Sequence, residues 1–183
     1  GMNEHGLVVG MAAVPPGNMR VDPDKPSIGS VGVIRKMLDG ARTVDEAMAL
    51  LDGYTIDFGG GPPIHYLIAD RSGRAVLVEF YRGQRHLFYN EAPWHQATNF
   101  LRASADEPAV RCWRYDAIAR RLAAQEGKLS SPEAMDLLAQ VAQGGTQWSV
   151  VYVLTSSSVS VAMGRDYRDV HAFELEAEGQ LGN

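Results

Sequence analysis

Residues 64–89, IHYLIADRSGRAVLVEFYRGQRHLFY, decide the fold class of this chain. Three runs within them, IHYLIA, AVLVEFY and RHLFY, have the length and the β-branched and aromatic content of strands. The first two runs are joined by DRSGR, which has the composition of a turn, and the last two are joined by RGQ. Connections this short can only return the chain antiparallel, so the segment predicts a β-meander.

Apolar runs of strand length also lie far from the meander, both before and after it. They occur at 6–14, 148–154, 159–163 and 170–175. In the run at 148–154, apolar residues take consecutive positions, which is typical of a strand in a sheet that is covered on both faces. The chain is therefore predicted to have strands near both ends as well as in its middle.

Segments with helical spacing separate these strands. Four stretches have apolar residues three or four positions apart: 28–38, 43–52, 108–126 and 131–143. Thr43 and Glu46 form a capping-box pattern at the start of the second stretch. Antiparallel strands flanked by helix pairs predict an α+β fold, most simply two facing antiparallel sheets with flanking helices. We expect a single domain at 2–183, with Gly1 left over from expression and 176–183 as a tail.

Composition and charge exclude several classes of function. The net charge is -5 and the isoelectric point is about 5.5, without a block of Lys and Arg, so neither nucleic acid nor an anionic membrane is expected as a partner. No apolar run approaches the roughly 20 residues of a membrane span and no signal sequence opens the chain, which predicts a cytoplasmic protein. A single cysteine, Cys112, excludes an intrachain disulfide, and the five histidines lack the spacing of metal ligands. We therefore expect no metal and no cofactor.

The segment 94–101, WHQATNFL, ends a predicted strand on a polar pair, Thr98 and Asn99. Residues 96–99 would form the next strand of the meander or its continuation. As an isolated residue, Asn99 is expected to support a turn, because an Asn side chain bonds to nearby backbone groups. The alternative is a rigid amide donor directed into a site.

Several segments, in order along the chain, match one family pattern. Residues 2–7 (MNEHGL) match G-M-N-E-x-G-L, and 65–73 with 78–79 match a strand-turn-strand pattern, D-x-x-G followed by V-V-E. Residues 97–100 match an L-T-N segment, and 108–111 match a P-A-S-R helix start. Together they resemble the choloylglycine hydrolases and the acyl-CoA:6-aminopenicillanic acid acyltransferases, which are N-terminal nucleophile hydrolases acting on linear amide C–N bonds. The resemblance covers nearly the whole chain and implies an αββα sandwich.

This resemblance implies roles for two residues. Asn99 corresponds to the Asn of the family's oxyanion hole, whose amide stabilises the negative charge that develops on the attacked carbonyl oxygen. Arg111 corresponds to the family's active-site arginine, which supports the nucleophile through charge and hydrogen bonds. An exposed helix arginine is the alternative for Arg111. Ala13 stands where some bile-salt hydrolases carry an Asn, so a second Asn donor is not expected.

The nucleophile of the family is a cysteine at the mature N-terminus, whose α-amine serves as the base. That cysteine, with an arginine and an aspartate after it, lies upstream of the M-N-E signature, and this chain starts at the signature. Cys112 does not match its position, and inside a predicted helix it is expected to be a small buried thiol. We therefore expect a chain without its own nucleophile.

Three interpretations remain open. The chain is the C-terminal portion of a linear amide C–N hydrolase or acyltransferase, inactive alone, whose substrate is a small-molecule amide or acyl compound. Alternatively it is a catalytically silent α+β domain that binds a small ligand or a partner. In the third interpretation, a second polypeptide supplies the cysteine of a two-chain enzyme. Because missing N-terminal strands would uncover sheet edge and core, we expect a homodimer, or a missing N-terminal segment or subunit that covers them.

Overall fold

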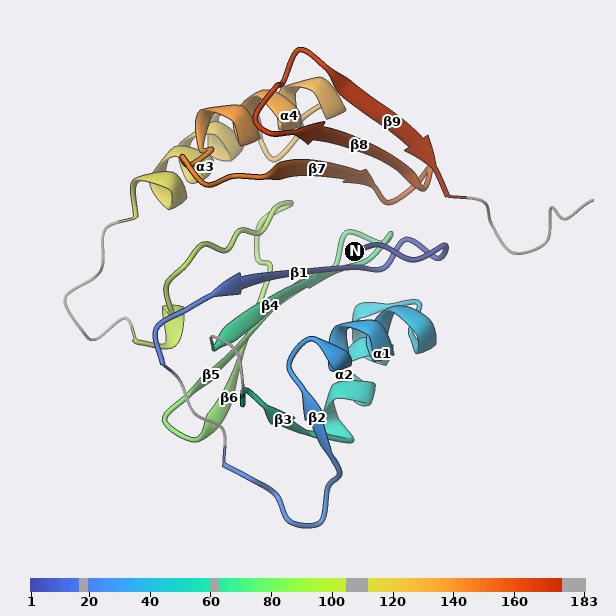
Figure 1. The fold of residues 1–183 in the computed structure, drawn as a ribbon, viewed down its shortest axis with the longest axis vertical. Helices are drawn as coiled ribbons and strands as arrows, with labels where there is room; N and C mark the ends of the chain where they lie inside the picture. Colours follow the sequence, from blue (N-terminus) through green and yellow to red (C-terminus); the bar gives the residue numbers. More distant parts are fainter. Residues whose placement is uncertain (17–19, 60–62, 105–111, 176–183) are drawn as a thin grey trace, which may run out of the picture.

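The described residues form two β-sheets with helices on their outer sides. The structure, a computed structural model, describes residues 1–16, 20–59, 63–104 and 112–175. The two sheets face each other, with α1 and α2 outside the first and α3 and α4 outside the second (Figure 1). The predicted α+β fold with antiparallel sheets and flanking helices is confirmed.

The first sheet has four antiparallel strands in the order β1-β4-β5-β6. The strands are β1 (Val8–Ala13), β4 (Ile64–Ala69), β5 (Ala75–Tyr81) and β6 (Gln84–Tyr89). The last three form the predicted meander, and β6 begins one residue earlier than expected. β1 pairs with β4, so β1 is an edge strand of this sheet.

The segment between β1 and β4 contains two short strands and two helices. These are β2 (Ser27–Gly29), α1 (Gly32–Gly40), α2 (Val44–Asp52) and β3 (Thr55–Asp57). The prediction of one helix over 28–38 was wrong at its start, because Ile28 pairs in parallel with Ile56 and α1 begins only at Gly32. A strand partner this far along the chain outweighs local apolar spacing.

The start of α2 is held by both local and tertiary hydrogen bonds. Thr43 is the N-cap, and its hydroxyl oxygen accepts from the backbone N–H of Glu46 at 3.2 Å, as predicted. The backbone N–H of Val44 donates to the buried carboxylate of Asp70 at 2.8 Å. Because Asp70 directly follows β4, this bond ties the helix to the sheet.

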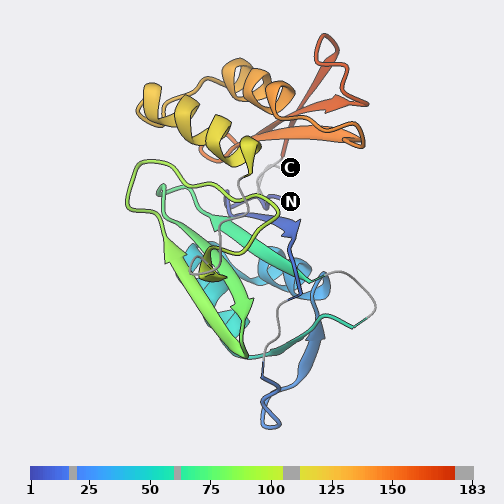
Figure 2. The ribbon, with the colours of Figure 1, turned by 90° about the vertical axis from the view of Figure 1, so that its left-hand side faces the viewer.

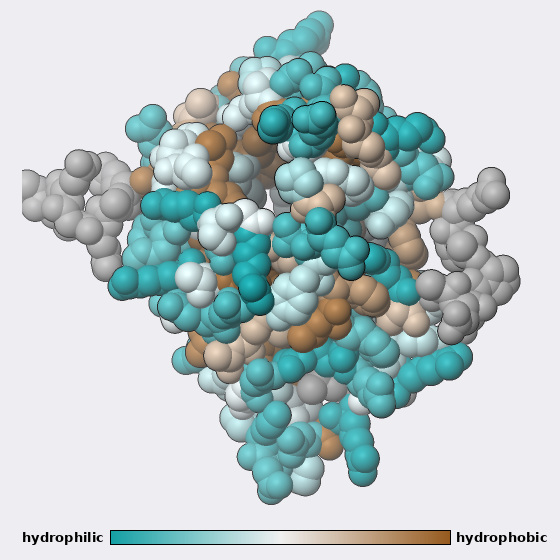
Figure 3. All heavy atoms as spheres, turned by 180° about the vertical axis from the view of Figure 1, so that it is seen from behind, coloured by the Kyte–Doolittle hydropathy of each residue, from teal (hydrophilic) through white to brown (hydrophobic). Residues whose placement is uncertain are grey.

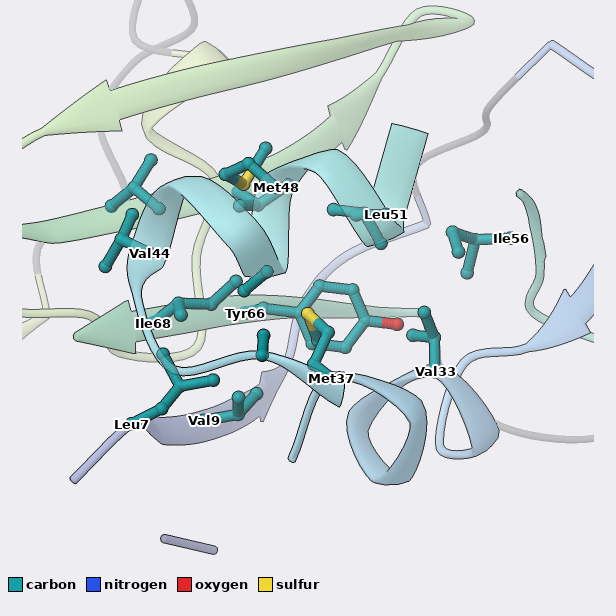
Figure 4. Packing of buried hydrophobic residues seen from close by; sticks show 14 of the residues in the cluster. Leu7, Val9, Val33, Met37, Val44, Met48, Leu51, Ile56, Tyr66 and Ile68 are labelled. Atoms are coloured by element: carbon teal, nitrogen blue, oxygen red, sulfur yellow. The ribbon is translucent and has the colours of Figure 1, made fainter. Parts of the chain in front are cut away.

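The hydrophobic core of this half lies between the four-stranded sheet and the helix pair (Figure 4). Tyr66 projects from β4 toward Met37 and Val33 of α1, and all three are fully buried. The Tyr66 hydroxyl donates to the carbonyl oxygen of Ser30 at 2.8 Å, so its polar atom is satisfied. Burial raises the pKa of Tyr66 well above its usual value.

The second sheet has three antiparallel strands in the order β7-β8-β9 and is covered by two helices (Figure 2). The elements are α3 (Trp113–Ala124), α4 (Ser131–Gln140), β7 (Trp148–Val153), β8 (Ser158–Met163) and β9 (Val170–Glu174). Ser130 caps α4 in a capping box with Glu133. Several large hydrophobic side chains are exposed, among them Trp148 and Phe173, and hydrophobic residues reach the molecular surface in Figure 3.

Of two expectations for the segment that connects the sheets, one was wrong and the other concerns residues that the structure does not describe. Residues 96–99 do not form a strand and are irregular, and a short 3₁₀ turn follows at Arg102–Ser104. The proposed helix start at Pro108 lies outside the described residues, and α3 is described from Trp113. No helix in the described part of the chain has the length and apolar character needed to cross a membrane.

Candidate functional site

Asn3, in the M-N-E segment, has a structural role. Its Nδ2 donates to the carbonyl oxygens of Leu38 at 2.9 Å and Ala41 at 2.7 Å. Its Oδ1 accepts from the backbone N–H groups of His5 at 3.1 Å and Leu7 at 2.9 Å. This buried amide therefore fixes the turn before β1 against the end of α1.

Gly6 and Arg71 connect the two sheets. Gly6 has φ +77°, and a Cβ at this position would clash with the carbonyl oxygen of Leu154, in the turn after β7. The same carbonyl accepts from Arg71 Nε at 2.9 Å, and Arg71 Nη2 donates to Ser157 Oγ at 3.3 Å. Glycine is required here both by the backbone conformation and by the close approach.

Asn99 is held by two hydrogen bonds from opposite directions. Its Oδ1 accepts from Arg114 Nη2 at 2.8 Å, and its Nδ2 donates to the carbonyl oxygen of Ala13 at 2.7 Å. The amide nitrogen carries two hydrogens, and Ala13 takes one of them. No described residue accepts the second hydrogen, and the arginine fixes which way the amide points.

A cavity of about 910 Å³ lies beside this amide, between the two sheets. Its walls include β1, Leu67 of β4, Trp148 and Tyr152 of β7, and the end of α4. Asn99 and Arg114 both line it. Asn99 itself is exposed to solvent.

The outer edge of β1 runs along the same cavity. Gly1 and Val9 exchange two backbone hydrogen bonds of 2.9 Å, which begins a short antiparallel ladder on that edge. Because hydrogen bonding alternates along an antiparallel strand, Met11 and Ala13 direct their backbone groups to the same side as Val9. β1 is an edge strand, and on this side no strand among the described residues pairs with it at Met11; the Ala13 carbonyl oxygen on the same side accepts from Asn99.

Two buried residues support the segment that follows Asn99. Glu79 and His65 are 0% and 1% exposed, and His65 Nδ1 lies 3.2 Å from Glu79 Oε1. The Glu79 carboxylate also accepts from the backbone N–H groups of Arg102 at 3.0 Å and Ala103 at 2.8 Å. Burial alone raises the pKa of Glu79, but these hydrogen bonds hold it below its usual value. The pair thus anchors the 3₁₀ turn to the sheet.

Cys112 differs from its expected state. It is the N-cap of α3, it is half-exposed, and its Sγ accepts from the Thr98 hydroxyl at 3.4 Å. Burial alone raises the pKa of the thiol, but hydrogen bonds from Thr98 and from the backbone of Tyr115 and Arg114 lower it overall. The expectation of a small buried thiol inside a helix was therefore wrong, because Cys112 is partly exposed and directly precedes α3. Cys112 does not line the cavity between the sheets.

The structure describes only one of the two site residues that were named from the sequence. Asn99 lines the cavity, whereas Arg111 lies outside the described residues. Arg114 orients Asn99, and the sequence analysis did not assign it a role. Its only sequence signal is its position near the start of the predicted helix.

Solved structures of two enzymes are similar to this chain. A variant of conjugated bile acid hydrolase from Clostridium perfringens has a TM-score of 0.74 at 15% identity, over 94% of this chain and 71% of that chain. A mutant of the same enzyme has a TM-score of 0.72 at 15% identity, over 95% of this chain and 71% of that chain. Penicillin V acylase from Agrobacterium tumefaciens has a TM-score of 0.67 at 17% identity, over 89% of this chain and 62% of that chain. Identities this low show a shared fold.

The family is shown by a separate comparison. The model of the family described as acyl-coenzyme A:6-aminopenicillanic acid acyl-transferase matches residues 1–121 of the 183, which is more than half of the chain. The resemblance inferred from the short motifs is thereby confirmed. This chain belongs to the acyl-coenzyme A:6-aminopenicillanic acid acyl-transferase family.

Proposed function

We propose that this chain forms the carbonyl-polarising part of a hydrolase or acyltransferase of linear amide C–N bonds, and that the attacking thiol is not among residues 1–183. The observation that supports this most is the free hydrogen of Asn99 Nδ2 at the cavity wall, with the amide oriented by Arg114. A donor fixed before the reaction stabilises the oxyanion without reorganisation.

The free edge of β1 supplies a place for the thiol. A strand added antiparallel along Met11 and Ala13 would extend the ladder that Gly1 begins and would project side chains toward the cavity. A thiolate delivered there could attack a carbonyl carbon whose oxygen accepts from Asn99. Covering the cavity would also shield the exposed Asn99 from solvent, which strengthens the electrostatic effect of the donor.

The substrate class is inferred from the cavity and from the names of the similar structures. A volume of about 910 Å³ falls in the range of small-molecule sites. One similar enzyme is named for conjugated bile acid and the other for penicillin V. We infer a small-molecule amide or acyl compound, with no metal and no cofactor in the reaction.

Chemical supply of the thiol tests the proposal. The chain is mixed with 4-nitrophenyl hexanoate and 2-mercaptoethanol; the thiolate attacks the acyl carbon, 4-nitrophenolate leaves, and the hexanoyl thioester forms. We expect a saturable acceleration over the thiol alone that falls about a hundredfold in Asn99→Asp. The new carboxylate would still pair with Arg114 but would donate no hydrogen bond to the oxyanion.

The control for this change is Asn90→Asp, which makes the same substitution outside the cavity. Asn90 uses both of its amide ends to hold backbone groups of Ala75, Gly73 and Ala92. An acceleration that is unchanged in Asn99→Asp contradicts the donor role. An acceleration that disappears in Cys112→Ala instead assigns the chemistry to the chain's own thiol.

A catalytically silent domain that binds a small ligand or a partner is the second candidate. It is favoured by the exposure of Asn99 and by its bond to Ala13, which would then serve only to join the loop to β1. This candidate predicts that no thiol accelerates ester cleavage in the presence of the chain, while ligands still bind the cavity.

A further inference from the structure

His65 and Glu79 face each other on neighbouring strands of the first sheet. Because Tyr66 of β4 pairs with Val78 of β5, the next residues of this antiparallel ladder, His65 and Glu79, are also opposite each other. Their side chains point away from the hydrophobic core that holds Tyr66 and Val78, because successive side chains of a strand alternate between its two faces. Both are nonetheless fully buried, and the 3₁₀ turn Arg102–Ser104 lies over Glu79.

The Glu79 carboxylate accepts three hydrogen bonds. Two come from the backbone N–H groups of Arg102 and Ala103, and the third comes from His65 Nδ1. An ionised carboxylate can only accept, so Nδ1 carries the hydrogen of the imidazole. The other ring nitrogen, Nε2, is buried and has no hydrogen-bond partner among the described residues, so the ring is used to hold Glu79. A glutamine in place of Glu79 would direct N–H groups at one of these donors.

A short, constrained piece of chain joins this anchored turn to Asn99. Only Phe100 and Leu101 lie between Asn99 and the 3₁₀ turn, and Leu101 is buried. The backbone N–H of Phe100 donates to the carbonyl oxygen of Thr98 at 2.9 Å, which closes a tight turn centred on Asn99. A displacement of the 3₁₀ turn is therefore passed directly to Asn99.

We propose that Glu79, held by His65, is a positioning residue for the Asn99 donor. The carboxylate fixes the 3₁₀ turn, the turn fixes the backbone at Asn99, and Arg114 orients the amide at the cavity wall. This inference rests on the proposed function of Asn99 as an oxyanion donor. Position matters because a displacement of about 1 Å can lower the rate of a catalysed step by roughly a hundredfold.

The side-chain amide resonances of Asn99 in the ¹⁵N-labelled chain report its position without any reaction. They are identified by their loss in Asn99→Asp. Glu79→Gln should shift both resonances, because the 3₁₀ turn loses part of its acceptor and moves. A role in stability alone predicts unchanged resonances at temperatures where the variant is folded.

Asp70→Asn is the matched control. Asp70 is also a buried carboxylate, and it accepts from the backbone N–H of Val44 at 2.8 Å. It follows the end of β4 that pairs with the start of β1, whereas Asn99 bonds to the last residue of β1. Asp70→Asn should therefore leave the Asn99 resonances in place. Equal shifts in Asp70→Asn and Glu79→Gln would overturn the inference, because any change at a buried carboxylate would then move Asn99.

The rate readout is the acceleration of 4-nitrophenyl hexanoate cleavage by 2-mercaptoethanol in the presence of the chain. Glu79→Gln should lower the maximal acceleration about tenfold and change the half-saturating ester concentration by less than about twofold. The loss is smaller than in Asn99→Asp because the donor is displaced instead of removed. A role in stability alone predicts that neither quantity changes in the folded variant.

His65 supplies a second pair of variants, which leave the carboxylate in place. His65→Asn keeps an N–H donor near the position of Nδ1 and should leave the Asn99 resonances unchanged. His65→Leu removes the donor, should shift the resonances, and should lower the acceleration about threefold. Unchanged resonances in both Glu79→Gln and His65→Leu would overturn the inference. Shifted resonances, with an acceleration that even Asn99→Asp leaves unchanged, would confirm that Glu79 positions Asn99 and contradict only the donor role.

Discussion

The two halves of the molecule are built from the same kinds of element but differ in how completely they pack. Before β6, a continuous core of buried side chains joins the four-stranded sheet to α1 and α2. Among the described residues after 112, the only buried hydrophobic side chains are Met135, Leu137 and Ala162. Trp148 and Phe173 of the second sheet are 62% and 56% exposed. The first half therefore has its own core, whereas the second presents apolar surface beside the cavity.

A matched pair of phenylalanines gives the largest expected contrast. Phe80→Ala removes a 3% exposed ring that packs against Phe58 and Tyr66, and should lower the free energy of unfolding by about 3 to 5 kcal/mol. Phe173→Ala, on β9, should change it by less than about 0.5 kcal/mol. Urea denaturation measures both. Equal losses of unfolding free energy in the two variants would show that Phe173 is buried in solution.

The next contrast concerns the buried carboxylate below the 3₁₀ turn. Glu79→Gln should lower the free energy of unfolding by about 2 kcal/mol at neutral pH, because hydrogen bonds to a charged group are replaced by weaker ones. The wild-type stabilisation depends on pH because the pKa of Glu79 is lowered in the folded chain. It is complete above the usual value of 4.5 and is lost as the pH falls through the lower folded pKa.

The measurement is the free energy of unfolding from neutral pH down to acid pH in both proteins. The decline below the usual pKa should be shallower in Glu79→Gln, because one titrating group is gone. The buried Asp70, whose pKa is also lowered despite its burial, should leave a residual decline. Parallel curves would show that Glu79 does not contribute to acid sensitivity.

An effect of similar size is expected where the two halves meet. Gly6→Ala forces a positive φ on a side chain and places its Cβ against Leu154, which should cost about 1 to 3 kcal/mol. Gly73→Ala has a similar φ of +86° but nothing within 4 Å of its Cβ, so it reports the conformational strain alone. Equal losses in thermal melts would mean that the contact with Leu154 is absent in solution.

The smallest effect expected is self-association through the apolar surface near the cavity. Met11, on the free edge of β1, and Trp148 are both exposed, and exposed edges and patches promote pairing between copies. We predict a homodimer whose dissociation constant rises about tenfold in Trp148→Ser. Light scattering across a concentration series measures it, and a monomer at all concentrations would contradict the prediction.

Local signals in the sequence predicted most of the fold. The meander and the Thr43 cap depend on residues close together in the chain, and both are present. The helix start at 28 was misplaced because Ile28 pairs with Ile56 in a parallel strand pair. The spacing of apolar residues cannot reveal such a long-range contact. The irregular segment at 96–99 was misread as strand because Thr98 and Asn99 bond to side chains and to a carbonyl of distant segments instead of to a neighbouring strand.

The candidate site was less predictable. Asn99 was identified only through the family resemblance, since an isolated Asn is more often a turn residue. Arg114 was not assigned because its bond to Asn99 joins a loop to a helix start, a pairing that spacing does not reveal. Cys112 was misjudged because a helix was expected from 108, whereas α3 is described from Trp113: as the N-cap, Cys112 gains hydrogen bonds that a mid-helix residue could not receive.

Release of amine from penicillin V by the chain alone tests the central claim most directly. The account places an oriented donor, Asn99, in this chain and the attacking thiol elsewhere, so it predicts no turnover above buffer for the wild type or for Cys112→Ala. Turnover by the wild type that Cys112→Ala abolishes would contradict it, because the half-exposed thiol at the start of α3 would then be the nucleophile.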